Sequence, residues 1–362
     1  MGKILSVIRA KSSLECLPCD RVNLDFGNFG DYQDAGEHPA ERPFEHPTVP
    51  TGKRAVAEVP AGVPSILRFF LDGSRRTYKI ADLILDGRRY LPVVAGQIGV
   101  AVVERGDDGK MVHPVRRFCR LENAIAFPDS IGSEELSELQ TEVNHHVPVF
   151  FKLLRYQAKP DDPSRDPADL AVAKIMSEMH DIEIQAVREM EEEQYLNDPC
   201  GMLLIDGPLR FRKRFDLVQF RNVLGLSKTF RPTFTVGKGA RRADVGSITS
   251  ALRFAERTSV YKTIDEEKVI GVWYLRIRRR SMMTNPLEGI VKVERYAIDS
   301  SDQEEGFESD RIDTISRHIL RERNVSPYQS DSRWASHIYP VFLAETYLKS
   351  SFMSDMQFKA LF

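Results

Sequence analysis

Two acidic residues stand where apolar segments of the chain end, and each is followed by glycine. Asp72 ends the segment FFLDG, and Asp206 ends the segment LLIDG. A short apolar run before a turn residue predicts a buried strand, so each carboxylate is expected at the rim of a sheet, where the glycine allows a tight turn. Aspartate also begins many ordinary turns. Two such strand ends in one chain nevertheless favour a shared site.

A third acidic residue, Glu183, falls inside the apolar stripe of a predicted helix, between Met179 and Val187. A carboxylate there is costly to bury unless it is paired or binds a cation. Chain length points to the same residue. From the turn expected near residue 199, about seven residues of extended strand lead to Asp206 and cover roughly 23 Å. A helix needs roughly 15 residues to cover the same distance back from that turn, which leads to the region of Glu183. The neighbouring glutamates mostly lie off the stripe and predict a solvated helix face; they are Glu189, Glu191, Glu192 and Glu193.

Three carboxylates at one sheet edge would form a site of hard oxygen ligands, which suits Mn²⁺ or Mg²⁺. Two such ions can activate a water and stabilise the leaving oxygen when a phosphodiester is cleaved. The zinc patterns HxxxH and HExxH are absent from the sequence, and so are the nucleotide-binding patterns GxGxxG and GxxxxGK[ST]. The acidic residues therefore predict metal-dependent phosphodiester hydrolysis, and the chain is not expected to bind ATP through a P-loop.

The elements that must position these residues are predicted from periodicity. Segments 66–74, 76–85 and 93–105 are expected to be consecutive strands of an antiparallel meander. A long helix should begin at the Asp166–Pro167 cap and end near Leu196, before a strand at 201–206. Later elements are a helix at 245–258, a strand pair at 269–278 and 289–298, a helix at 310–320 and a helix after Pro340. This order predicts an α/β protein with an RNase H-like mixed sheet flanked by helices.

The first part of the chain differs in texture from the rest. Five prolines between residues 39 and 60 stand among charged residues, so residues 1–60 are interpreted as an irregular N-terminal extension or arm and residues 61–362 as the functional domain. The composition is that of an ordinary globular protein, with 42% hydrophobic and 29% charged residues. Because the formal net charge is only -2, any surface for nucleic acid must be local.

Location is predicted from what the sequence lacks. No apolar run approaches the roughly 18 residues of a membrane span, and the N-terminus has no apolar core of a signal peptide. Cys16 and Cys19 form a CxxC pair with no second pair to complete a zinc site, so a structural or incidental role is favoured over a metal or redox role. A cytoplasmic protein with no membrane partner is expected.

Several segments together resemble the NurA nuclease family, and their order covers about residues 65–350. The two DG strand ends and the SKT segment are the most specific parts. The segments are FFLDGS at 69–74, EMHDIEIQAV at 178–187, LLIDGPL at 203–209, LGLSKTF at 224–230, IVKVERY at 290–296 and YPVFLAETY at 339–347.

This resemblance implies an RNase H-like fold related to Piwi modules and Mn²⁺-dependent endo- and exonuclease activity on DNA. It also implies a homodimer that docks on a hexameric HerA-type ATPase. Asp72, Glu183 and Asp206 would be the metal ligands. Lys228 would lie near the scissile phosphate, the alternative being a surface lysine in a turn.

One segment departs from the family pattern YP…L…AH, whose histidine belongs to the active site. The matching segment has Tyr347 at the place expected for that histidine. His337 lies just upstream and is the candidate replacement, the alternative being a surface histidine. Together with the proline-rich arm, this departure is compatible with a divergent branch, such as one working in phage defence.

Contact with DNA requires positive charge near the acidic residues. Two basic clusters directly follow a predicted metal ligand, and a glycine-flanked basic loop follows later. The predicted DNA-binding residues are Arg75, Arg76, Arg210, Arg212, Lys238 and Arg241. A further basic cluster contains Arg276, Arg278, Arg279 and Arg280, although charge runs are usually solvated faces.

Three functions remain open from the sequence. The first is a DNA nuclease that is the cutting subunit of a translocase complex, in DNA end processing or anti-phage defence. The second is a catalytically weakened subunit of the same fold that binds DNA or the ATPase as a scaffold. The third is an RNase H-like enzyme that acts on RNA or hybrids, although no feature of the sequence reads the 2′-hydroxyl.

Overall fold

A long antiparallel hairpin forms the middle of the structure. Its strands, β4 (Leu67–Leu85) and β5 (Arg89–Arg105), pair over almost their whole length. The turn between them contains Asp86 and Gly87 with positive φ, a conformation that aspartate and glycine tolerate well. The prediction of two separate strands at 66–74 and 76–85 is wrong, because Gly73 continues the ladder of β4 opposite Val100 instead of turning.

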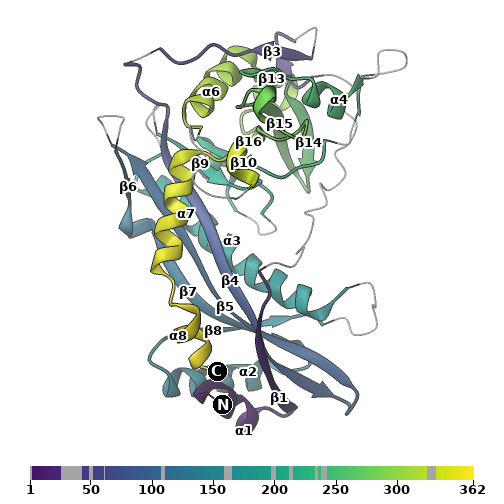
Figure 1. Ribbon diagram of the computed structural model, residues 1–362, viewed down its shortest axis with the longest axis vertical. Helices are drawn as coiled ribbons and strands as arrows, with labels where there is room; N and C mark the ends of the chain where they lie inside the picture. The colour runs from purple at the N-terminus through teal and green to yellow at the C-terminus, as the bar shows by residue number, and fades with distance from the viewer. Residues whose placement is uncertain are drawn as a thin grey trace.

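The computed structural model describes residues 2–25, 43–48, 52–60, 62–106, 111–158, 165–196, 201–211, 215–232, 235–237, 243–323 and 332–362. Most strands belong to one 13-stranded mixed sheet (Figure 1). Its order is β3 (Lys53–Ala55), β13 (Glu256–Thr258), β15 (Lys268–Arg276), β16 (Ile290–Tyr296), β10 (Val223–Ser227), β9 (Met202–Asp206), β4, β5, β7 (Arg120–Pro128) and β8 (Phe151–Tyr156).

Strand direction divides this sheet. β9 and β10 run parallel to β4, and β8 runs parallel to β7, whereas the other neighbours on this path are antiparallel. The remaining strands are β1 (Glu15–Asn23) beside β4, β6 (Val112–Pro114) beside β5, β14 (Tyr261–Asp265) beside β15, and the small pairs β2 (Glu45–His46) with β17 (Phe307–Glu308) and β11 (Thr235–Val236) with β12 (Ala243–Asp244). The chain is therefore a mixed α/β protein, as predicted at that level.

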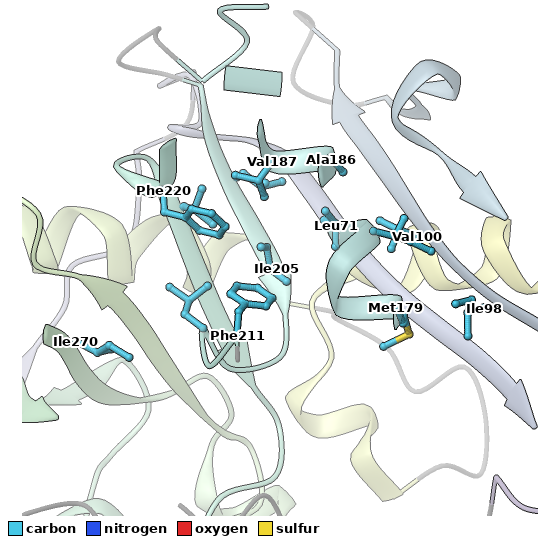
Figure 2. Close-up of a cluster of buried hydrophobic side chains, with 14 of the residues drawn as sticks. Leu71, Ile98, Val100, Met179, Ala186, Val187, Ile205, Phe211, Phe220 and Ile270 are labelled. Carbon is cyan, nitrogen blue, oxygen red and sulfur yellow. The ribbon is translucent and has the colours of Figure 1, made fainter. Parts of the chain in front are cut away.

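Helix α3 (Pro167–Glu192) covers one face of the sheet. Asp166 caps it as predicted, because its side-chain oxygen accepts a hydrogen bond from the Ala168 amide at 2.8 Å. The apolar stripe of α3 packs against Leu71 of β4 and Val100 of β5 in one buried cluster (Figure 2). The predicted strand after this helix is also confirmed, as β9.

Helices α6 (Ser309–Arg321) and α7 (Tyr339–Ser351) cover the opposite face. Side chains alternate along a strand, so Phe70 and Leu71 of β4 point to different sides. Phe70 belongs to the cluster that contains Ile312 of α6 together with Val341 and Leu348 of α7. Both helices were predicted, as was the antiparallel pair β15–β16.

The other helices are short or lie at the far end of the hairpin. Helices α1 (Lys3–Lys11), α2 (Ser133–His146) and α8 (Asp355–Ala360) share a third apolar cluster with the second half of β4. The short ones are α4 (Val245–Ser250), α5 (Ser300–Glu305), η1 (Arg116–Phe118), η2 (Leu217–Phe220), η4 (Arg280–Met282) and η5 (Ser332–Ser336). Among the described residues, no helix is both long enough and apolar enough to span a membrane.

Two sequence-based interpretations need correction. The helix expected at 245–258 is only α4, because residues 256–258 pair with β3 and β15 as β13, and this sheet pairing outweighs local helix preference. The first part of the expected irregular arm is regular, since α1 packs in the third apolar cluster and β1 pairs with β4. Residues 26–42 lie outside the described part of the chain, whereas two later pieces of the expected arm form β2 and β3, which pair with β17 and β13.

Helix α7 approaches β5 closely at Gly99, and this contact can be tested. A Cβ atom there would lie 2.7 Å from both Leu348 Cδ1 and the Arg120 carbonyl oxygen. Gly99→Ala should therefore lower the free energy of unfolding by about 1–3 kcal/mol, measured by urea titration. Gly96→Ala on the same strand meets nothing nearer than 3.0 Å and should cost less. Equal losses for the two variants would contradict close packing of α7 at Gly99.

Candidate metal centre

Strand register brings Asp72 and Asp206 together. Leu71 of β4 pairs in parallel with Ile205 of β9, so the next residues on the two strands are Asp72 and Asp206. Burial raises the pKa of Asp72 well above its ordinary range, and the adjacent charge of Asp206 raises it further.

The sheet forms an edge beside Asp72 and Asp206, although strand β4 itself continues past Asp72. Asp206 is the last residue of β9, and Gly207 after it has a φ of 135°, so the predicted strand end and turn are found here. Asp72, in contrast, lies within β4, and only 5% of its surface is exposed. Asp72 reaches the edge because its neighbour β9 stops, not because β4 turns.

Glu183 approaches β4 from helix α3. A Cβ atom on Gly73 would lie 2.2 Å from Oε1 of Glu183, so glycine is needed at this position for close approach and not for a turn. Glu183 is 4% exposed, and in the described part of the chain it has no hydrogen bond or ion pair. Burial, followed by the charge of Asp206, raises the pKa of Glu183 to about 8.

The two faces of the sheet contribute separately to this group. Gly73 faces α3, because Glu183 lies against it, and the alternation of side chains then turns Asp72 toward the face covered by α7. Asp206 acts electrostatically on both Asp72 and Glu183. The carboxylate at the end of β9 therefore links acidic residues that come from opposite faces.

Lys228 provides the nearest counter-charge. Its Nζ atom lies 2.7 Å from Oδ2 of Asp206, and the two side chains are 11% and 18% exposed. Burial by itself would lower the pKa of Lys228, but the negative charges of Asp206 and Asp72 outweigh this effect, and the pKa is raised. Lys228 directly follows β10, the parallel neighbour of β9, so the structure brings it beside Asp206.

Sequence reasoning missed a fourth carboxylate, Glu345 of α7. Leu348, one turn further along α7, lies against Gly99, which pairs with Ser74 two residues after Asp72. The charge of Glu345 accordingly raises the pKa of both Asp72 and Lys228. The signal was present in YPVFLAETY, where Glu345 stands between the buried residues Ala344 and Leu348.

The two other residues considered in this C-terminal segment pack against apolar side chains. His337 precedes α7, is 9% exposed and stacks on Phe342, with 6.3 Å between ring centroids. Tyr347 is partly buried against the apolar cluster of that face. Helix α7 rises roughly 9 Å between Tyr339 and Glu345, so Glu345 and not His337 is the residue that α7 brings toward Asp72.

The predicted DNA-binding arginines that are described make internal contacts. Arg75 Nη1 lies 3.5 Å from Asp25, and Arg76 Nη1 lies 3.0 Å from Asp355. Arg210 is 8% exposed, with Nε 3.9 Å from Glu294. Arg212, Lys238 and Arg241 lie outside the described residues.

The residues present suit a divalent cation by charge and by donor chemistry. Four carboxyl groups, from Asp72, Glu183, Asp206 and Glu345, gather with one ammonium group in a largely buried place. A divalent cation that prefers oxygen ligands, Mn²⁺ or Mg²⁺, would compensate the free-energy cost of ionising these buried carboxyl groups. The raised pKa values reflect that cost. Among the described residues, no group of three His, Cys, Asp or Glu side chains is arranged to hold a metal ion.

The buried proton on Glu183 predicts a dependence of stability on pH. The pKa of Glu183 is raised from 4.5 to about 8, so the folded chain holds a proton in this window that the unfolded chain releases. The stability gained from this group is complete below pH 4.5 and is lost as pH rises toward 8, by at most about 1.4 kcal/mol per pH unit. Glu183→Gln lacks this loss, so without metal it should gain stability relative to wild type from pH 5 to 8. Parallel urea-titration profiles for the two proteins would rule out a buried, protonated Glu183.

Comparison with known proteins leaves the site to be interpreted from its own geometry. A scan against protein-family models and a search of curated proteins both find no match to this chain. The interpretation therefore rests on the described residues: two aspartates in register, a glutamate without a partner from α3, a glutamate from α7 and a lysine bonded to Asp206. Together they form a candidate centre for an oxygen-loving divalent cation.

Proposed function

We propose that this chain is a divalent-metal-dependent deoxyribonuclease. The observation that carries the proposal is Glu183, a carboxyl group that is 4% exposed, lies against Gly73 and is acted on by the charge of Asp206, with no hydrogen bond among the described residues. A buried carboxyl group without a partner is unfavourable unless it serves a site. Beside a second and a third carboxylate, the ligand class that fits is a divalent cation.

The sheet supports an RNase H-like core for this enzyme. The strands β10, β9, β4, β5 and β7 lie side by side in this order, with β9 and β10 parallel to β4 and with β5 and β7 forming the antiparallel meander. Helix α3 precedes β9 in the chain and covers one face. This arrangement agrees with the order in the chain on which the RNase H-like expectation was based: three strands, a helix and then a strand parallel to the first.

In the proposed enzyme, Asp72, Glu183 and Asp206 hold Mn²⁺ or Mg²⁺. When bound, the ions supply Lewis acidity and an activated water for hydrolysis of the phosphodiester. Glu183 gives up its proton to become a ligand, because a carboxylate binds a cation in its ionised form. Lys228 holds Asp206 in place and adds positive charge for the scissile phosphate.

The wider setting follows from the resemblance of the motifs to the NurA nucleases. On that basis the chain is a cytoplasmic homodimer and the cutting subunit of a HerA-type ATPase complex, in DNA end processing or anti-phage defence. The alternative is a catalytically weakened scaffold. The family has a histidine in the segment where this chain has Glu345, whose charge acts on Asp72. Because of this difference, the experiment below also tests the scaffold alternative.

Cleavage assays with a matched pair of variants test the proposal. Wild type should cut DNA with Mn²⁺ or Mg²⁺ and not in EDTA, alone or with its cognate ATPase. Asp72→Asn should lower the rate at least about 100-fold, because a metal ligand is lost. Asp82→Asn removes an aspartate from the same strand, where it pairs with Lys79 at 2.8 Å, and should keep activity. If intact wild type binds DNA or the ATPase but never cuts, the chain is the scaffold and not the nuclease.

The role of Glu345 is tested through metal affinity. Glu345→Gln keeps the shape of the side chain but removes a charge close to Asp72, so Mn²⁺ should bind roughly 10–100-fold more weakly in calorimetric titrations. Lys349→Met is the control, because it removes the ion-pair partner of Glu345 and leaves the carboxylate in place. Unchanged Mn²⁺ affinity in Glu345→Gln, with the fold intact, would show that Glu345 is only a surface charge.

A further inference from the structure

Four arginines stand at the end of strand β15, and among the described residues no carboxylate forms an ion pair with them. Burial lowers the pKa of Arg276 and Arg278, and the other charges that act on them, Arg280 and Arg323, are also positive. Arg279 and Arg280 are exposed, and neither has an ion pair in the described part of the chain. Positive charge is therefore concentrated here without internal compensation.

Arg278 is the fixed member of this group. It is 6% exposed, its Nε donates to the carbonyl oxygen of Ala335 at 3.1 Å, and its guanidinium lies 5.1 Å from the ring centroid of Trp334. Its Nη2 atom is buried and has no hydrogen-bond partner in the described part of the chain. A guanidinium nitrogen left without an acceptor is costly to bury, and an anionic oxygen that reached it would remove this cost.

A further arginine, Arg323, shares one aromatic ring with Arg279. The guanidinium of Arg279 lies 5.9 Å from the ring centroid of Phe254, and that of Arg323 lies 5.2 Å from it. Arg323 also approaches Glu58 at 3.6 Å, but that glutamate side chain is 65% exposed, so the pair is weak. Both guanidinium groups therefore contact the same aromatic ring.

This arginine group lies at the same edge of the sheet as the acidic centre. β9 and β10 end there at Asp206 and Ser227, β16 begins there at Ile290, and β15 ends there at Arg276. Three strand spacings separate β9 from β15, roughly 14 Å at about 4.8 Å each. A duplex of a few base pairs, at about 3.4 Å per step, spans this distance.

A polyanion needs such a group to approach the acidic centre. The carboxylates of the centre repel a phosphate backbone until cations neutralise them. Lys228 is bonded to Asp206, and Arg75, Arg76 and Arg210 make internal contacts. In the part of the chain that the structure describes, Arg279 and Arg280 are thus exposed cations at this edge that remain available to a ligand.

We propose that Arg278, Arg279, Arg280 and Arg323, set around Phe254 and Trp334, form a binding site for the phosphodiester backbone of DNA beside the acidic centre. The inference rests on the proposed function for its substrate. Arg279 and Arg280 contact phosphates from the surface, Arg323 adds charge across Phe254, and Arg278 supplies the rigid base of the site. The site fixes the position of the backbone and reads no base sequence.

The test measures DNA binding in EDTA, where cleavage cannot interfere. Arg279→Ala/Arg280→Ala changes two exposed side chains and should weaken binding of a labelled duplex at least about tenfold near 0.1 M salt. The dependence of log affinity on log salt should flatten by up to about 1.8, since each phosphate contact contributes about 0.9. The control is Arg88→Ala/Arg89→Ala, which removes the same charge at the turn between β4 and β5.

Equal weakening by both double variants, or no weakening by Arg279→Ala/Arg280→Ala, would overturn the site. Displacement of DNA by polyglutamate as effectively as by unlabelled DNA would also overturn it, in favour of an acidic protein partner. If only the nuclease proposal fails, the result differs: wild type does not cut DNA with metal, but Arg279→Ala/Arg280→Ala still weakens DNA binding. If wild type and Arg279→Ala/Arg280→Ala cut DNA at the same rate and with the same salt dependence, the arginine site is excluded and the nuclease proposal stands.

Discussion

The arrangement of the acidic centre depends on one unfavourable contact, the burial of the Glu183 carboxyl group against the backbone of β4. No hydrogen bond compensates it in the described part of the chain, and its pKa is raised to about 8 as a result. The contact exists because Gly73 leaves room for the carboxyl group and because α3 is held on the sheet by its apolar stripe. The apolar packing of α3 thus offsets the cost of placing a titratable group beside Asp206.

The rest of the sheet determines which groups meet this carboxyl. Parallel pairing of β9 with β4 sets Asp206 next to Asp72, and parallel pairing of β10 with β9 brings Lys228 to Asp206. Helix α7 closes the opposite face and adds Glu345. The centre is therefore formed by two helices on opposite faces, by β4, which continues through it, and by β9 and β10, which end beside it. Such a centre is sensitive to the packing of either helix.

Much of this could be predicted from the sequence, because apolar periodicity identifies buried faces. The stripe that contains Glu183, the Asp166 cap and the strand that ends at Asp206 all follow local rules. Local rules failed where tertiary pairing decides. Gly73 has the sequence context of a turn, yet it continues a long strand and gives space to a side chain more than a hundred residues away. Glu345 was missed because only the packing of α7 on β5 shows which of its residues approaches Asp72.

The chain positions of the four carboxylates have a consequence for the newly made protein. Asp72, Glu183 and Asp206 are synthesised well before Glu345, and α7 can pack only after its own residues have left the ribosome. At ordinary rates of translation this interval is on the order of ten seconds. During that time the sheet exposes the face that α7 will cover, and the acidic group lacks its fourth member. The acidic centre therefore has all four carboxylates only after the C-terminal segment with α7 has been synthesised.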